Sequence, residues 1–284
     1  AAGGAGRRQV VKLLTVLQAK AFQAWSYWYS RPGQVRQLVR ALGARRSANL
    51  RTIRFDRIRV AAVQVRVEPA PDAASFVQQL FPLMQEAVEK GAQLVVFPEE
   101  ITLGLLAMLP GFESLPTAGF QEALASLGPD VTLRDILYVL GPALRRIYQA
   151  AFSEFSRAFG VYVAAGSTLG LTRGRVYNTA YLFGPDGRLV GTQPKAHLLP
   201  LERQLGISRG AQLQVFPTRI GRLALPVCMD ATYFETLRIL VLNGAEIVAL
   251  PVANPEPYNV WRARRGLWPR VQESPVYGVK ACLV

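Results

Sequence analysis

From residue 57 onward, short apolar segments alternate with longer segments in which apolar residues recur at a helical period. The short segments have the length and the flanking Gly, Pro or polar residues that are typical of buried strands. Such an alternation of strands and helices predicts an α/β domain. The predicted strands are 58–65, 94–97, 161–165, 177–183, 189–192, 220–227 and 246–250, and the predicted helices are 73–90, 144–159 and 232–243. Pro82 predicts a kink or a later start for the first of these helices.

The first 55 residues differ in composition from the rest of the chain. They contain 11 Lys and Arg and no Asp or Glu, so the remaining 229 residues hold 22 basic and 19 acidic side chains. We therefore expect a basic N-terminal arm, residues 1–55, followed by a nearly neutral domain, residues 56–284. The balanced charge of the domain does not favour a nucleic-acid partner.

The arm has the apolar pattern of two amphipathic helices, at 10–28 and 35–42, with a Pro-Gly break at residues 31–33. Lysine and glutamine residues interrupt the apolar run that a membrane-spanning helix would need. Three interpretations remain open. The helices pack on the domain, or residues 8–46 contact a membrane surface through basic and aromatic side chains, or the arm is an organelle-targeting segment. We expect a cytoplasmic protein, associated with membranes under the second interpretation.

Cysteine and histidine are scarce. The two cysteines, Cys228 and Cys282, cannot build a disulfide framework, and no Cys-x-x-Cys pair indicates a zinc site. His197 is the single histidine, which excludes metal sites with two or three His ligands and acid–base schemes with two imidazoles. Chemistry must therefore come from carboxylates, lysine, cysteine or hydroxyl groups.

Three reactive side chains, Glu99, Lys195 and Cys228, each follow a predicted strand. Residues just past strand ends tend to line the site of an α/β protein. Cys228 lies between an apolar strand and an amphipathic helix, where the helix N-terminus and a nearby lysine should lower the pKa of the thiol from about 8.5. Taken singly, each residue has an alternative interpretation. A cysteine is commonly a small buried hydrophobe, and we assign this role to Cys282. Glu99 with Glu100 fits a solvated acidic pair or a helix-capping cluster. Lys195 fits a surface cation.

The order of the motifs resembles the nitrilase superfamily of carbon–nitrogen hydrolases, from about Arg57 to Val284. The family pattern is a strand followed by Pro-Glu, then Lys-x-His-Leu, then Cys-x-Asp before a helix that carries Phe-Glu or Pro-Glu. The matching residues are Phe97-Pro98-Glu99, Lys195-Ala196-His197-Leu198, Cys228-Met229-Asp230, Phe234-Glu235, and Asn243-Gly244-Ala245-Glu246 before the strand that ends at Pro251.

The resemblance implies a four-layer α-β-β-α sandwich with the site at the strand ends. It implies that Glu99 is the general base, that Cys228 is the nucleophile and that Lys195 stabilises the oxyanion, with no metal or organic cofactor. Glu202 and the backbone N–H of Met229 are accessory candidates, although Glu202 lies seven residues after Lys195 where the family spacing is eight.

The same resemblance leaves other points open. His197 is expected to be structural, with a Cys228–His197 dyad as the rival mechanism. The segment 101–148 is expected to form a lid, with an added pair of surface helices as the alternative. Relatives continue past the position of Val284 for a further pair of strands, so we expect a truncated sheet.

The implied function is hydrolysis of non-peptide carbon–nitrogen bonds through a thioester acyl-enzyme, with a small-molecule amide as substrate and a homo-oligomer as the assembly. An N-acyltransferase or a nitrilase with the same triad is an alternative function. A catalytically silent, membrane-associated scaffold is the alternative from a different class.

Overall fold

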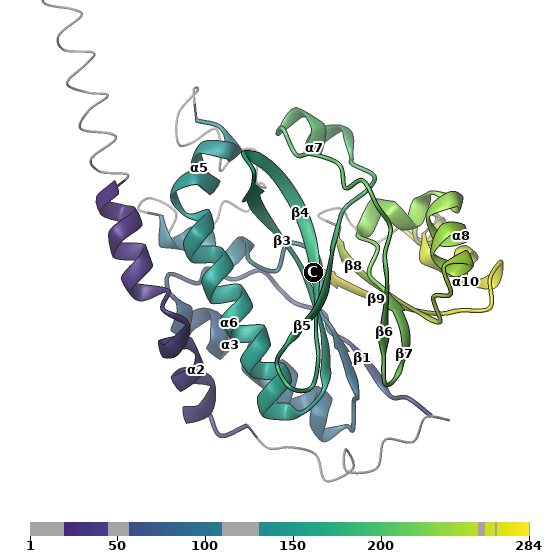
Figure 1. The fold of residues 1–284 in the computed structure, drawn as a ribbon, viewed down its shortest axis with the longest axis horizontal. Coiled ribbons are helices and arrows are strands. Elements are labelled where there is room, and N and C mark those ends of the chain that lie inside the picture. The colour runs from purple at the N-terminus through teal and green to yellow at the C-terminus, as the bar shows by residue number, and fades with distance from the viewer. Residues whose placement is uncertain (1–19, 45–56, 110–130, 255–258, 265, 284) are drawn as a thin grey trace, which may run out of the picture.

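The computed structural model describes residues 20–44, 57–109, 131–254, 259–264 and 266–283. Two sheets form its centre (Figure 1). The first sheet has the order β1 (Val60–Ala62), β2 (Leu94–Val96), β3 (Tyr162–Thr172), β4 (Arg175–Phe183) and β5 (Leu189–Pro194). The second has the order β6 (Val215–Thr218), β7 (Gly221–Ala224), β8 (Ile247–Ala253) and β9 (Tyr277–Leu283).

Each sheet mixes parallel and antiparallel pairs. Strands β1, β2 and β3 are parallel, and β3, β4 and β5 follow as an antiparallel meander. In the second sheet β6 and β7 are antiparallel, whereas β7, β8 and β9 are parallel. The described helices are 20–29, α2 (Pro32–Ala41), α3 (Ala73–Glu89), η2 (Leu103–Met108), α5 (Leu133–Val139), α6 (Gly141–Phe159), α7 (Pro200–Gln204), η3 (Cys228–Thr232), α8 (Phe234–Leu242), α9 (Val260–Ala263) and α10 (Leu267–Gln272).

Three apolar clusters separate four layers. The largest lies between the first sheet and the helices α3 and α6, where Phe76, Phe97 and Phe152 pack together. The second lies between the two sheets and includes Leu94 and Leu223. The third packs the second sheet against α8 and α10. The α-β-β-α arrangement expected for the fold is therefore confirmed (Figure 1).

Capping residues set the ends of the main helices. The carboxylate of Asp72 accepts a hydrogen bond from the backbone N–H of Ser75 and caps the start of α3. The helix runs through Pro82 without interruption, so the predicted late start is wrong. Helix α6 ends at Gly160, which has the left-handed backbone (φ 73°) that glycine adopts without a Cβ penalty.

The predicted strand at 58–65 is longer than the observed β1, and the reason is a change of sheet. The backbone N–H of Val63 still bonds to Val96 of β2, but Val65 bridges Leu283 of β9. The chain therefore leaves the first sheet for the second. By contrast, β3 extends beyond the predicted 161–165, because pairing with β4 continues to Thr172.

The described part of the arm packs on the domain, and this packing leaves the interpretation as a membrane-contacting arm open. Helix α2 buries Val35 and Val39 in the cluster that contains α3 and α6. The guanidinium of Arg40 also pairs with Glu154 on α6 at 3.1 Å. Among the described residues, no helix is both long enough and apolar enough to cross a membrane. The predicted boundary at residue 55 and the first half of the predicted helix at 10–28 lie outside the described residues.

The segment expected to form a lid is described only at its two ends. Leu105 and Leu106 of η2 are buried, and α5 covers α6 and the edge of β3. These ends therefore belong to the core rather than to a cover over the site. Residues 110–130 lie outside the described residues, so the lid itself stays a prediction.

Candidate active site

Glu99 lies just beyond the end of β2, and a glycine on the neighbouring strand fixes its position. The backbone N–H of Phe97 still bonds to Ala164 of β3, and the chain then turns at Pro98. A Cβ on Gly166 (φ 70°) would come within 1.9 Å of the Pro98 carbonyl oxygen. Only glycine allows this approach, at the point where the register of β3 shifts. The glycine bulge therefore directs the buried Glu99 side chain into the space between the strand ends.

The Glu99 carboxylate accepts three hydrogen bonds from three different parts of the fold. Its Oε1 accepts from Lys195 Nζ at 2.8 Å and from Asn178 Nδ2 at 2.9 Å. Its Oε2 accepts from the backbone N–H of Ala253, at the end of β8, at 2.9 Å. Glu99 therefore links the first sheet to the second, and its carboxylate is held in one orientation.

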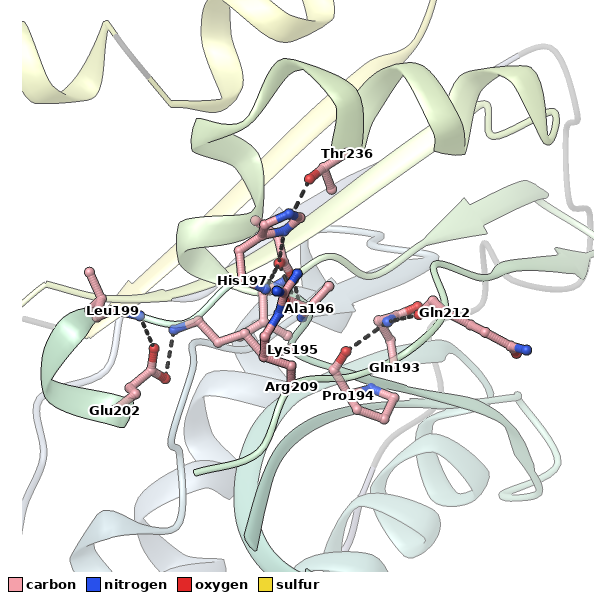
Figure 2. A network of polar contacts seen from close by, with 12 residues as sticks. Gln193, Pro194, Lys195, Ala196, His197, Leu199, Glu202, Arg209, Gln212 and Thr236 are labelled. Carbon is pink, nitrogen blue, oxygen red and sulfur yellow. Dashed lines mark hydrogen bonds and ion pairs between the residues drawn. The ribbon is translucent and has the colours of Figure 1, made fainter. Parts of the chain in front are cut away.

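Lys195 follows β5 and places a cation between two carboxylates. Its side chain is only 1% exposed, and Nζ lies 2.8 Å from both Glu99 Oε1 and Glu202 Oε1 (Figure 2 shows the contact with Glu202). Burial alone would lower the pKa of Lys195, but the charges of Glu99, Cys228 and Glu202 together raise it above its ordinary value. Lys195 is therefore an ammonium ion over the whole range in which proteins function. The alternative interpretation of Lys195 as a surface cation is wrong.

The backbone around Lys195 is held as firmly as its side chain. Its N–H donates to the carbonyl of Asn178 on β4, and its carbonyl accepts from the N–H of Gly210. Glu202 stands on α7, where its Oε2 accepts from the backbone N–H of Leu199 and caps the helix (Figure 2). The spacing of seven residues therefore still brings Glu202 onto Lys195.

Cys228 occupies a strained turn between β7 and α8. It has a left-handed backbone (φ 46°), which is unusual for a residue other than glycine, Asn or Asp and is typical of nucleophiles on sharp turns. The residue begins the 3₁₀ turn η3, and α8 starts only at Phe234. Burial, followed by the charge of Glu99, raises the pKa of the Cys228 thiol well above its ordinary value, against the opposing effect of Lys195. The expectation of a lowered pKa is therefore wrong, since the half-buried thiol lies beside a carboxylate and α8 starts only at Phe234.

Asp230 braces the turn that carries Cys228 against the loop that carries Lys195. Its buried carboxylate accepts from the backbone N–H of Val227 at 2.9 Å and from that of His197 at 2.7 Å. It also accepts from the N–H of Ala196. Two loops from different sheets thus share one carboxylate, which sets the position of the cysteine relative to the lysine.

The His197 ring contacts Asp230, Tyr233 and Thr236. Its Nδ1 lies 3.0 Å from Asp230 Oδ1, and its ring stacks on Tyr233 with 4.3 Å between the centroids. The same Nδ1 also lies 3.4 Å from the hydroxyl of Thr236 (Figure 2). These contacts favour the structural role for His197 over a Cys228–His197 dyad, because Asp230 and Thr236 both lie against its Nδ1.

The structure adds two residues that the sequence did not single out. Asn178 is fully buried on β4 and donates to Glu99, while its own Oδ1 is a buried acceptor without a hydrogen-bond partner among the described residues. A polar residue at an inward position of a strand is the signal that could have identified it. Glu100 has a left-handed backbone (φ 52°), and burial together with the charge of Glu99 raises its pKa to about 8.

The arrangement offers a thiol, a carboxylate and a buried cation in one place. It can remove a proton from the thiol, stabilise an oxyanion and return the proton to a leaving group. Among the residues that the structure describes, no cluster of three His, Cys, Asp or Glu side chains forms a metal site. Cys282 lies on β9 and packs against the cluster between the second sheet and its helices, apart from these groups.

Comparison with known proteins agrees with this geometry. Residues 59–271 match the Carbon-nitrogen hydrolase family. The probable hydrolase YhcX of Bacillus subtilis is 27% identical over 223 residues, which cover 78% of this chain and 39% of that protein. The omega-amidase NIT2 of Danio rerio is 26% identical over 207 residues (70% of this chain, 64% of that protein), and a nitrilase of Pyrococcus abyssi is 28% identical over 199 residues (70% and 65%). The chain therefore spans less than two thirds of the length of these relatives.

Solved structures show the same fold. An amidase from Nesterenkonia sp. AN1 superposes with a TM-score of 0.60 at 21% identity, over 82% of this chain and 78% of that one. A carbon-nitrogen hydrolase from Helicobacter pylori G27 gives a TM-score of 0.59 at 21% identity, over 80% and 73%. Because the family match covers most of the chain and the fold agrees, this protein belongs to the carbon-nitrogen hydrolase family of the nitrilase superfamily.

Proposed function

We propose that this protein is an amidase that hydrolyses small non-peptide amides through a thioester on Cys228. The observation that carries the proposal is the convergence of Glu99, Lys195 and Cys228 at the ends of strands from both sheets. Each of these residues alone has an ordinary structural explanation, whereas a buried base, cation and thiol together match covalent catalysis.

In the proposed mechanism Glu99 is the general base. The raised pKa of Cys228 keeps the sulfur as a thiol until a substrate binds, so the proton passes from Sγ to Glu99 as the sulfur attacks the carbonyl carbon. A carbon–sulfur bond forms, and the carbonyl oxygen becomes an oxyanion. The ammonium of Lys195 and the backbone N–H of Met229, in the first turn of η3, stabilise that negative charge.

The protonated Glu99 then donates its proton to the leaving nitrogen, and the carbon–nitrogen bond breaks. The acyl group remains on Cys228 as a thioester. Glu99, again a carboxylate, removes a proton from water as the water oxygen attacks the thioester carbonyl. The carbon–sulfur bond breaks, the carboxylic acid leaves, and Glu99 returns its proton to the Cys228 thiolate. Glu202 holds Lys195 in place through this cycle and keeps the cation directed at the site.

The alternative functions use the same acyl-enzyme. An amine in place of water gives N-acyl transfer, and a nitrile in place of an amide gives a nitrilase. We favour amide hydrolysis because the relatives include proteins named omega-amidase and solved amidases. A silent scaffold is disfavoured, since the buried Glu99–Lys195–Glu202 cluster costs desolvation energy that a non-catalytic core would not need.

The test is release of ammonia from a panel of primary amides, with the corresponding nitriles and acyl-acceptor amines in parallel. Wild type should release ammonia from at least one amide, and Cys228→Ala should not. The matched control is Cys282→Ala, which removes the other thiol and should leave the rate unchanged. Turnover of nitriles alone, or acyl transfer that exceeds hydrolysis, would replace the amidase proposal by the corresponding alternative.

We also propose that the protein forms homo-oligomers through the face of α8 and α10. Ile239, Leu242 and Trp268 are exposed there, at 44%, 73% and 68%. Contiguous exposed apolar side chains of this size favour a protein partner, and the nearly neutral charge of the domain allows a second copy to face the first. Light scattering should give at least a dimer for wild type and a monomer for Leu242→Glu; an unchanged mass in the variant would refute this face as the interface.

A further inference from the structure

The helix at residues 20–29 packs on the domain through Phe22, which is partly buried against the core, and through two serines, of which Ser30 directly follows the helix. Ser26 and Ser30 are buried, at 2% and 0% exposed. Their hydroxyl groups donate to the carbonyls of Gln23 and Tyr27 in the preceding turn, so both hydroxyls have hydrogen-bond partners within the segment. Because serine is small, the helix can pack closely on the domain.

Apart from Phe22, which packs against the core, the aromatic side chains of the same helix are exposed to solvent. Four of them form what we name the aromatic face, and their exposed fractions are 43% for Trp25, 58% for Tyr27, 54% for Trp28 and 51% for Tyr29. An amphipathic helix in contact with its own domain normally buries such side chains. The orientation is therefore inverted, because the serines are inside and the Trp and Tyr rings are outside.

Specific contacts hold the helix in this orientation. Arg146 of α6 donates from Nε to the hydroxyl of Ser30 at 2.9 Å and places its guanidinium over the ring of Tyr27. On the other flank, Gln23 donates to the carbonyl of Tyr138 on α5 at 2.9 Å. The rings of Trp25 and Tyr29 lie 4.9 Å apart and support each other. The aromatic face is therefore presented by a docked helix.

The segment that carries the aromatic face is basic, although one of its cations, Arg40, is paired with Glu154 of α6. Residues 20–44 contain Lys20, Arg31, Arg36 and Arg40 and no Asp or Glu. The guanidinium of Arg31 lies 3.4 Å from the centroid of the Trp28 ring, so one cation sits directly on the face. Figure 1 shows this helix on the outer side of α5 and α6, away from the α8 and α10 layer.

We infer that the aromatic face is a docking surface for anionic lipid membranes. Trp and Tyr rings favour the headgroup region, where an apolar ring and a polar edge are both satisfied, and basic side chains beside them are attracted to acidic headgroups. A second copy of the chain is a poorer occupant, since a two-fold contact would bring Lys20, Arg31 and Arg36 against their own counterparts. The inference is independent of the proposed hydrolase function, because none of these residues touches the site.

The experiment is sedimentation of the protein with vesicles of phosphatidylcholine, with and without phosphatidylserine. Wild type should bind the vesicles that contain phosphatidylserine, bind phosphatidylcholine alone more weakly, and detach as salt is raised. A variant with Trp25→Ser, Tyr27→Ser, Trp28→Ser and Tyr29→Ser should bind at least about tenfold more weakly, because burying one aromatic ring contributes about that factor or more.

The matched control changes aromatic residues of similar exposure elsewhere. Trp261→Ser with Tyr277→Ser alters side chains that are 65% and 79% exposed, and it should bind vesicles as wild type does. Circular dichroism of each variant checks its folding. Quenching of tryptophan emission by brominated lipid gives a second readout. In a Trp261→Phe and Trp268→Phe background only Trp25 and Trp28 emit, and their emission should be quenched on binding.

Three results would overturn the inference. Absence of binding to the phosphatidylserine vesicles removes it directly. Undiminished binding by the fourfold variant, or unquenched emission, moves the contact away from the aromatic face. Preference for single-stranded RNA in competition with vesicles, or self-association abolished by the fourfold variant in the absence of lipid, assigns the face to a different partner.

Discussion

Replacing Lys195 by methionine should destabilise the fold by about 3–5 kcal/mol at about pH 8, which is the cost of removing one partner from a buried ion pair. At 2.8 Å from each of two carboxylates, the ammonium gains about 6 kcal/mol of gross attraction per contact with an effective dielectric constant of about 20. Most of that attraction offsets the desolvation of three buried charges. Methionine fills a similar volume but leaves Glu99 and Glu202 facing each other without a cation.

The loss should depend on pH in a defined direction. In the variant the two carboxylates can stay buried only by taking up protons, so above about pH 4.3 the folded state binds more protons than the unfolded state. Stability therefore falls as the pH rises, and the difference from wild type should shrink near pH 5. Urea unfolding at about pH 5 and about pH 8, with the slope m held equal, measures both values.

Two further variants make this result specific. Lys195→Met with Glu202→Gln removes one of the two carboxylates that are left without a cation and should recover about half of the lost free energy. Lys90→Met removes an exposed lysine that pairs with Glu86 on the surface and should leave stability unchanged. A loss below about 1 kcal/mol for Lys195→Met, or a loss that is equal at both pH values, would refute the buried ion-pair account.

Three other substitutions test the surroundings of the site. Glu100→Gln should stabilise the protein by about 1–3 kcal/mol near pH 8 in urea unfolding and have little effect near pH 4. A folded pKa of about 8 for Glu100 means that the stability of wild type falls as the pH rises from the ordinary glutamate range. A difference between variant and wild type that is equal at both pH values would contradict this prediction. Gly166→Ala should lower the free energy of unfolding by about 2–4 kcal/mol and displace Glu99, since the alanine Cβ has no room beside the Pro98 carbonyl. A melting temperature equal to that of wild type would show that the bulge does not require glycine. Asn178→Leu should lower kcat/KM for an amide by about 10- to 100-fold, because it removes the donor to Glu99. The melting temperature is the control for folding. An unchanged kcat/KM would mean that Asn178 only fills space.

The candidate site could be assembled from the sequence because its residues follow strands. Glu99, Lys195 and Cys228 are far apart in the chain and follow β2, β5 and β7, which belong to two sheets, so the family resemblance was needed to join them into one site. Glu202 was also found, despite its spacing, since a short helix after the Lys195 loop returns it to the lysine. The four-layer order followed from the alternation of strands and helices together with the family resemblance.

Other features depend on three-dimensional surroundings that spacing does not encode. Asn178 sits at an inward position of β4 and cannot be told from a core residue until the end of β2 is placed beside it. The pKa of Cys228 was expected to fall, and it rises because burial and Glu99 outweigh Lys195. The inverted helix at residues 20–29 was equally hidden, since periodicity places Trp25 and Trp28 on an apolar side without saying which side the domain covers.

The central claim is the covalent role of Cys228, and intact-protein mass spectrometry tests it most directly. Wild-type protein is mixed briefly with an amide that it hydrolyses and is quenched in acid. Its intact mass is then measured in parallel with those of Cys228→Ala and Cys282→Ala. The account predicts an added acyl mass on wild type and on Cys282→Ala, located by peptide mapping to Cys228, and none on Cys228→Ala. Turnover of the amide by Cys228→Ala, or an acyl adduct on any other residue, would contradict it.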